Sequence, residues 1–169
     1  MKTKNFYKQV NFYLTIFSLG LVIAAFLLYL LNCPSEFNGG VVSREVVTGH
    51  IVAIIFILIA VVASIAEFYL KEKPVISEII KYRRFCLYIA FIALIYSFFM
   101  SILAEYSLIG TILYPIVSGT IGDPVEPLLA NSYFSQLINT LIAMVFIITS
   151  ALILKKGYYK AEKAAEGNK

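Results

Sequence analysis

The stretch IVAIIFILIAVVASIAEFYL, Ile51–Leu70, decides the fold of this chain. It has 20 residues, and the only charged one is Glu67 near its end. At about 1.5 Å per residue, a helix of this length matches the hydrocarbon core of a bilayer, which is about 30 Å thick. A water-soluble helix needs a polar stripe that faces solvent, and this stretch has none. We therefore interpret Ile51–Leu70 as a membrane-spanning helix.

Three further stretches have the same character: Val10–Leu31, Phe85–Ser107 and Tyr133–Leu154, of 22, 23 and 22 residues. The first and last carry no charge, and Phe85–Ser107 carries only Glu105. These stretches are too long and too unbroken for the strands of a membrane barrel. The sequence therefore predicts a single all-α domain, residues 1–169, with four transmembrane helices in an antiparallel bundle.

The composition of the whole chain agrees with this prediction. Hydrophobic residues make up 60% and charged residues 14% of 169 residues, and the mean hydropathy is +0.86. Soluble domains carry about 25% charged residues. A disordered chain, a collagen-like chain, a coiled coil and an ordinary soluble enzyme are all excluded.

The basic residues predict the orientation in the membrane. In a four-span topology, 13 of the 14 lysines and arginines lie on one side, and only Arg44 lies on the other. Because cytoplasmic segments are enriched in lysine and arginine, both termini are expected in the cytoplasm. The three basic segments are short and separate, so they do not form the continuous patch that nucleic-acid binding needs. Membrane lipid is the expected partner of these charges, and no nucleic acid is expected.

Two connections carry local signals. Pro74 in the linker Lys71–Arg84 is expected to block a helix, with an interfacial turn over Val75–Tyr82. On the outer side, the sequence Asp123-Pro124-Val125-Glu126 has the residues of a helix start, an N-cap followed by a capping-box glutamate. It predicts a short interfacial helix, Pro124–Ala130, before the fourth span.

Small and polar side chains are expected to hold the spans together. Lipid offers no hydrophobic driving force between helices, so they associate through small residues and interhelical hydrogen bonds. Each span has such residues at helical spacing, and we interpret them mainly as packing positions, with a wet path or binding site as the alternative. The predicted helix-packing residues are Ala93, Ser97, Ser101, Gly20 and Asn139.

The search for catalytic chemistry is largely negative. The chain has no glycine-rich phosphate loop and no serine elbow, and His50 is its single histidine. The two cysteines, Cys33 and Cys86, are expected on opposite sides of the membrane, at the outer end of the first span and the inner start of the third. They are therefore too far apart for a disulfide within one chain. We predict no enzymatic activity, no catalytic residues, no cofactor and no metal.

An outer-face polar group is the remaining candidate site. It comprises His50, Glu105, Asp123 and Glu126. His50 and Glu105 lie at the same predicted depth, so a hydrogen bond that fixes the bundle register is expected, with a divalent-cation site as the alternative. At the inner side, Glu67 precedes Lys71 by four residues, which favours an ion pair within one helix.

The layout resembles uncharacterised four-span bacterial membrane proteins. The residues that carry the resemblance are the basic linker Lys81-Tyr82-Arg83-Arg84 and the outer turn Gly122-Asp123-Pro124, within residues Leu19–Lys156. The resemblance implies a location in the bacterial cytoplasmic membrane and implies no activity. Immunity proteins against pore-forming bacteriocins have a similar layout, with a basic C-terminal end like Lys155-Lys156.

Three functions follow as hypotheses. The first is a structural or accessory role through lateral helix contacts, with a second copy of the chain or with another membrane protein. The second is an oligomeric pore or a subunit of a small-solute transporter. The third is immunity to a pore-forming bacteriocin.

Overall fold

The computed structural model describes residues 2–32, 44–69, 73–104 and 127–166, and all of them are helical. The helices are α1 (Lys2–Asn32), α2 (Arg44–Tyr69), α3 (Lys73–Ala104) and α5 (Pro127–Glu166). Each contains a segment long and apolar enough to cross a membrane: Lys8–Leu31, Arg44–Tyr69, Val75–Leu103 and Phe134–Lys155. By length and composition, the prediction of four membrane-spanning helices is confirmed.

The linker between the second and third spans is more helical than the sequence predicts. The interfacial turn expected over Val75–Tyr82 is wrong, because α3 begins at Lys73 and runs through this segment without a break. Pro74 lies in the first helical turn, where its missing N–H has no bond to lose. It therefore starts this helix rather than blocking one.

The separate interfacial helix predicted at Pro124–Ala130 is also wrong where it can be checked. Residues 127–130 form the first turn of α5, which continues through the fourth span to Glu166. Between Pro127 and Phe134 there is no glycine and no further proline, so nothing in this segment ends the helix. Residues 124–126 lie outside the described part of the chain.

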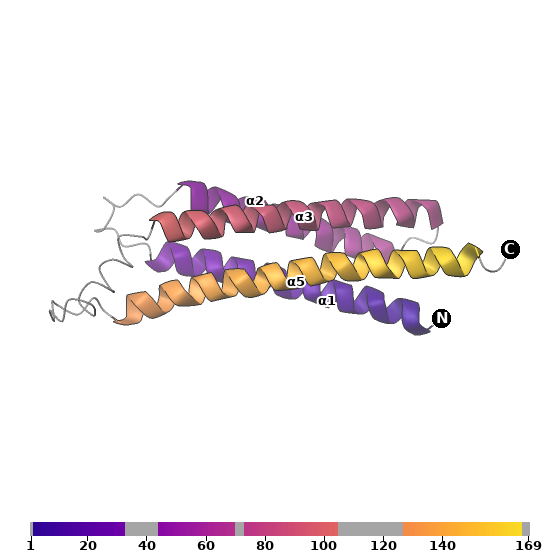
Figure 1. The fold of residues 1–169 in the computed structure, drawn as a ribbon, viewed down its shortest axis with the longest axis horizontal. Helices are drawn as coiled ribbons and strands as arrows, with labels where there is room; N and C mark the ends of the chain where they lie inside the picture. The colour runs from indigo at the N-terminus through magenta and orange to yellow at the C-terminus, as the bar shows by residue number, and fades with distance from the viewer. Residues whose placement is uncertain (1, 33–43, 70–72, 105–126, 167–169) are drawn as a thin grey trace.

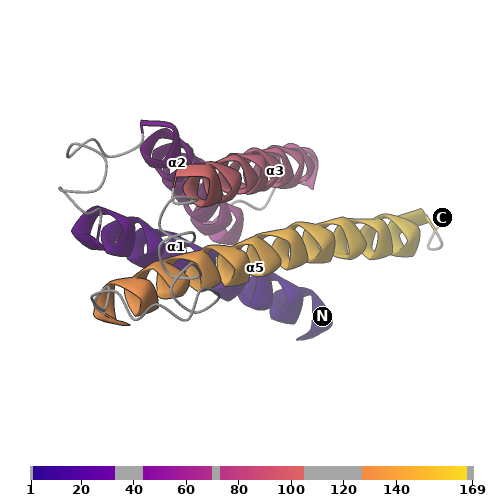
Figure 2. The same cartoon turned by 60° about the vertical axis from the view of Figure 1, so that its left-hand side comes forward.

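The four helices form a bundle of two packed pairs, α1 with α5 and α2 with α3 (Figure 2). α1 also contacts α2, and α3 also contacts α5, which places α1 diagonally opposite α3 and α2 diagonally opposite α5. The start of α1 and the end of α5 lie at the same end of the bundle (Figure 1). Buried side chains from all four helices fill the interior.

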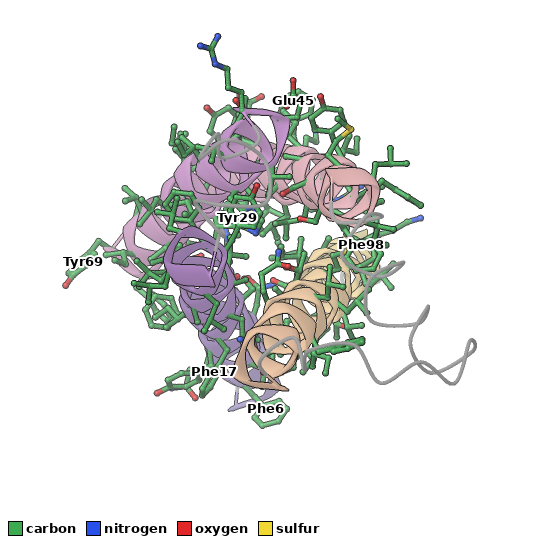
Figure 3. The ribbon with its side chains drawn as sticks, turned by 90° about the vertical axis from the view of Figure 1, so that its left-hand side faces the viewer. Phe6, Phe17, Tyr29, Glu45, Tyr69 and Phe98 are labelled. Atoms are coloured by element: carbon green, nitrogen blue, oxygen red, sulfur yellow. The ribbon has the colours of Figure 1, made fainter. Side chains whose placement is uncertain are left out.

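The surface of the bundle is apolar, and its interior holds polar as well as apolar side chains. Large apolar side chains are exposed on every helix, among them Leu31, Val62, Ile92 and Val145. Figure 3 shows two of the exposed aromatic residues, Phe17 and Tyr69, pointing away from the bundle. The buried polar or charged residues are Asn11, Thr15, Ser18, His50, Ser64, Glu67, Arg83, Ser97, Ser101, Gln136, Thr140 and Ser150. This distribution suits a protein whose solvent is lipid.

An apolar layer fills the middle of the interior. Val22, Ile57 and Leu94, from α1, α2 and α3, are fully buried there and belong to one hydrophobic cluster. Most of the buried polar side chains lie on either side of this layer, although Thr140 of α5 is level with it. The bundle thus has two polar clusters, one in each half of its length.

Candidate functional site

The first cluster surrounds Arg83, whose side chain is fully inside the bundle although it carries a permanent charge. Arg83 is 1% exposed, and its Nη1 donates a hydrogen bond to the Glu67 carboxylate of α2. Its Nη2 donates to Asn11 Oδ1 of α1, across the diagonal of the bundle. Lys8 Nζ lies 3.2 Å from the other oxygen of Glu67. One carboxylate is therefore shared by two cations from two helices.

Asn11 extends this cluster to the fourth helix. Its Nδ2 donates to the backbone oxygen of Ser150 at 2.8 Å and to Ser150 Oγ at 2.6 Å. Thr15 Oγ1 lies 3.1 Å from the same Ser150 Oγ and donates to the Asn11 carbonyl oxygen at 2.8 Å. Hydrogen bonds thus connect α2 to α3, α3 to α1 and α1 to α5. We call Lys8, Asn11, Glu67, Arg83 and Ser150 the charged cluster.

Burial makes the pairing within the charged cluster essential. Removing an ion from water is unfavourable by several kcal/mol, roughly, and a partner ion with good hydrogen bonds is needed to offset it. Arg83 and Glu67 are 1% and 3% exposed, so lipid and solvent reach neither of them. Ionisable side chains inside a membrane bundle are often functional, and here they also tie the helices together.

The predicted ion pair of Glu67 with Lys71 is not tested, because Lys71 lies outside the described residues. The structure shows instead that Glu67 binds Arg83 and Lys8, on two other helices. Sequence reasoning placed Arg83 among the basic residues that anchor the cytoplasmic linker. It missed that α3 starts early enough to put Arg83 on the buried face, one turn before Leu87.

The second cluster surrounds His50, in the half of the bundle where α2 begins. His50 is fully buried, and its Nδ1 lies 2.9 Å from the Val46 carbonyl oxygen and 2.6 Å from Ser97 Oγ. Ser97 Oγ also donates to the Val46 oxygen at 3.0 Å. Because a carbonyl oxygen only accepts, this arrangement assigns the proton to Nδ1 and leaves Nε2 with its lone pair. His50, Val46 and Ser97 thus join α2 to α3.

Aromatic rings from α1 cover the imidazole. The ring of Tyr29 stacks nearly parallel to it, with centroids 6.4 Å apart and planes 13° apart, and Phe26 lies 5.9 Å away. Tyr29 is buried and lies on the inner side of α1 (Figure 3). We call His50, Val46, Ser97, Tyr29 and Phe26 the histidine cluster.

A close approach of α2 and α3 sits beside the histidine cluster, at Gly49. A Cβ placed on Gly49 would lie 2.6 Å from Ser97 Cβ and 2.9 Å from the Ala93 carbonyl oxygen. Only glycine allows the two backbones to come this near. Sequence reasoning missed Gly49, because it started the second span at Ile51.

The predicted packing residues differ in how deeply they are buried. Ser97 and Ser101 are buried in the interior, and Ala93 lies half-buried against Gly49. Asn139 is half-buried. Gly20 is exposed, with no atom within 4 Å of its hypothetical Cβ, so its expected packing against a neighbouring span is not seen within this chain.

Of the predicted outer-face polar group, the structure describes only His50. Glu105, Asp123 and Glu126 lie outside the described residues, so the expected His50–Glu105 hydrogen bond stays a prediction. Among the residues that the structure does describe, no three histidine, cysteine, aspartate or glutamate side chains are grouped to hold a metal ion. What His50 binds within the described chain is Ser97 and Val46.

Comparisons with known proteins add no relative. No protein family matches the chain, and no curated protein and no solved structure matches it either.

Replacing Ser150 with alanine tests the hydrogen bonds of the charged cluster. The variant loses the hydroxyl shared by Asn11 and Thr15 but keeps the backbone oxygen that Asn11 also binds. We expect the free energy of unfolding to fall by about 0.6 kcal/mol, the average for a hydrogen bond between membrane helices, and by at most about 1.7 kcal/mol. Thr48→Ala is the control, because Thr48 is exposed and its hydroxyl bonds only within α2. Equal stability of Ser150→Ala and Thr48→Ala in detergent would contradict the expectation.

Proposed function

We propose that the chain is a four-span protein of the bacterial cytoplasmic membrane, with both termini in the cytoplasm and an antiparallel bundle. In this role it is an accessory protein that works through lateral helix contacts, with a second copy or with another membrane protein. The concentration of 13 of 14 basic residues on one side supports this orientation. The location of the start of α1 and the end of α5 at one end of the bundle is compatible with it (Figure 1).

One observation carries the proposal of lateral contact, the outward position of Tyr96. Its side chain is 48% exposed on the apolar surface of α3. It lies seven residues from Ile89, the centre of the Val75–Leu103 span, or about 10 Å at 1.5 Å per residue. That depth is inside the hydrocarbon half-thickness of about 15 Å, where lipid tails offer a phenolic hydroxyl no hydrogen bond. A helix from outside this chain can supply one.

The surface around Tyr96 has the shape of a helix-packing seam. Ile92, Phe99 and Leu103 are exposed with Tyr96, at intervals of four, three and four residues. This spacing places the four side chains on one stripe of α3, as at a coiled-coil seam. We therefore assign the contact to this stripe of α3.

A photo-crosslinking residue at position 92 tests the contact. In native membranes, we expect a protein adduct of one reproducible mass, twice the mass of the chain for self-association. Tyr96→Phe should reduce the yield of this adduct several-fold. The variant removes only the hydroxyl, and with it the proposed hydrogen bond to the partner helix. The same probe at Val62, which is 65% exposed on α2, is the control. Equal yields at both positions, lipid adducts alone, or a yield unaffected by Tyr96→Phe would contradict the proposal.

Transport is the second candidate, and the buried ions of the charged cluster favour it, because intramembrane charges often mark ion pathways. The apolar layer of Val22, Ile57 and Leu94 argues against an open pore in this conformation. Purified protein in liposomes distinguishes the candidates. Flux of a solute or ion that is lost in Gln136 and Asn139 variants would favour transport, and sealed liposomes would favour the accessory role.

A further inference from the structure

The side-chain amide of Gln136 is buried in the bundle without a hydrogen-bond partner among the described residues. Gln136 lies in α5 and is 1% exposed, and neither its Oε1 nor its Nε2 has a hydrogen-bond partner among the described residues. An amide buried without partners is unfavourable by about 1–3 kcal/mol or more. Native interiors satisfy such groups with protein atoms or with internal water.

The imidazole of His50 has a nitrogen, Nε2, that complements the Gln136 amide. Its Nδ1 is used by Val46 and Ser97, whereas its Nε2 is buried and has no partner among the described residues. With the proton on Nδ1, Nε2 is an acceptor. The Gln136 amide has an NH₂ group that donates and an oxygen that accepts. A molecule that donates a hydrogen bond to His50 Nε2 and also bonds to the Gln136 amide would satisfy both side chains.

The helix register brings these two groups to the same level. Phe17 of α1 lies beside Phe146 of α5, and Asn11 bonds to Ser150, so the two helices run in opposite directions. Phe26, nine residues after Phe17, is therefore level with about residue 137 of α5, next to Gln136. Phe26 also contacts the His50 ring at 5.9 Å. His50 and Gln136 are thus buried at one depth, on diagonally opposite helices.

We propose that His50 and Gln136 hold internal water in this half of the bundle, between the histidine cluster and the apolar layer. Water donates a hydrogen bond to His50 Nε2 and exchanges bonds with the Gln136 amide. Both side chains are neutral in this arrangement, so neither supplies a charge that would offset the burial of an ion. Tyr29 and Phe26 close its α1 side, and Leu94 and Ile57 belong to the layer that bounds it toward the charged cluster.

Water-selective nuclear Overhauser measurements test the site directly, on the full chain in deuterated detergent micelles. We expect cross-peaks from water to the His50 ring protons and to the Gln136 side-chain NH₂. The methyl groups of Ile147, which is fully buried in the hydrophobic cluster and lies 11 residues along α5 from Gln136, are the internal control and should show none. Absence of cross-peaks at His50 and Gln136, or equal cross-peaks at the Ile147 methyls, would overturn the proposal.

Two variants give an independent test. Gln136→Met keeps the shape and removes the amide, and His50→Asn keeps a donor near Nδ1 and removes Nε2. If water bridges the two groups, Gln136→Met lowers the melting temperature in the natural chain and changes it far less in the His50→Asn background. If the amide is simply unpaired in a dry interior, Gln136→Met raises the melting temperature by the same amount in both backgrounds. That second result would overturn the proposal.

Discussion

Replacing Glu67 with glutamine should lower the free energy of unfolding by about 3–5 kcal/mol, the range for breaking a buried ion pair from one side. The variant keeps the size of the side chain and removes its charge. Arg83, which is 1% exposed, then has no anion to offset its burial, and Lys8 loses its ion pair as well. Unfolding of purified protein, followed by circular dichroism in mild detergent, measures the effect.

Glu78→Gln is the matched control for this prediction. Glu78 lies on α3, close in sequence to Arg83, but its side chain is exposed. The control should unfold within about 0.5 kcal/mol of the natural chain, as is usual for surface substitutions. A second variant, Glu67→Gln with Arg83→Met, should recover part of the loss, because no unpaired guanidinium remains buried. If Glu67→Gln and Glu78→Gln have equal stability, the ion pair does not hold the bundle.

Gly49→Ala should destabilise the α2–α3 contact by about 1–3 kcal/mol or more, the usual range for overpacking. The new Cβ would lie 2.6 Å from Ser97 Cβ and 2.9 Å from the Ala93 carbonyl oxygen. Both atoms are fixed to the α3 backbone, so no side-chain rotation relieves the clash and the helices have to separate. The separation also weakens the 2.6 Å contact between His50 and Ser97. Thermal unfolding in detergent measures the loss.

Gly20→Ala is the control for this prediction, since both substitutions add one methyl group to a helical glycine. Nothing lies within 4 Å of the Cβ of Gly20. Alanine favours a helix over glycine by up to about 1 kcal/mol, so this variant should be as stable as the natural chain or more stable. A destabilisation of Gly20→Ala as large as that of Gly49→Ala would show that helix propensity or insertion, and not the close approach, causes the effect.

Composition and hydropathy were sufficient to predict the four helices and their approximate positions. The residue spacing also predicted the inward face of the third span, because Ser97 and Ser101 are small polar residues at a helical interval and both are buried. Spacing alone does not show which face of a helix packs against another helix of the chain. Gly20 was predicted as a packing residue in the same way, yet it faces outward.

The partners inside the bundle could not be predicted in the same way. Arg83 is 16 residues from Glu67 and 72 from Asn11, so these bonds depend on how far each helix extends and on the register between helices. A start of the third span at Phe85 leaves Arg83 outside the membrane, whereas the helix that begins at Lys73 carries it inside. Gly49 was missed for the same reason, since the second helix begins seven residues before Ile51.

The residues of the charged cluster are synthesised one after another as the membrane protein is made. A chain is synthesised from its N-terminus, so Lys8 and Glu67 are present before Arg83, and Ser150 is translated last. The 3.2 Å contact of Lys8 Nζ with Glu67 involves only the first two helices. Lys8 can thus neutralise the charge of Glu67 while only α1 and α2 are present, before α3 adds Arg83. The arrival of α5 then closes the bundle by adding Ser150 to Asn11.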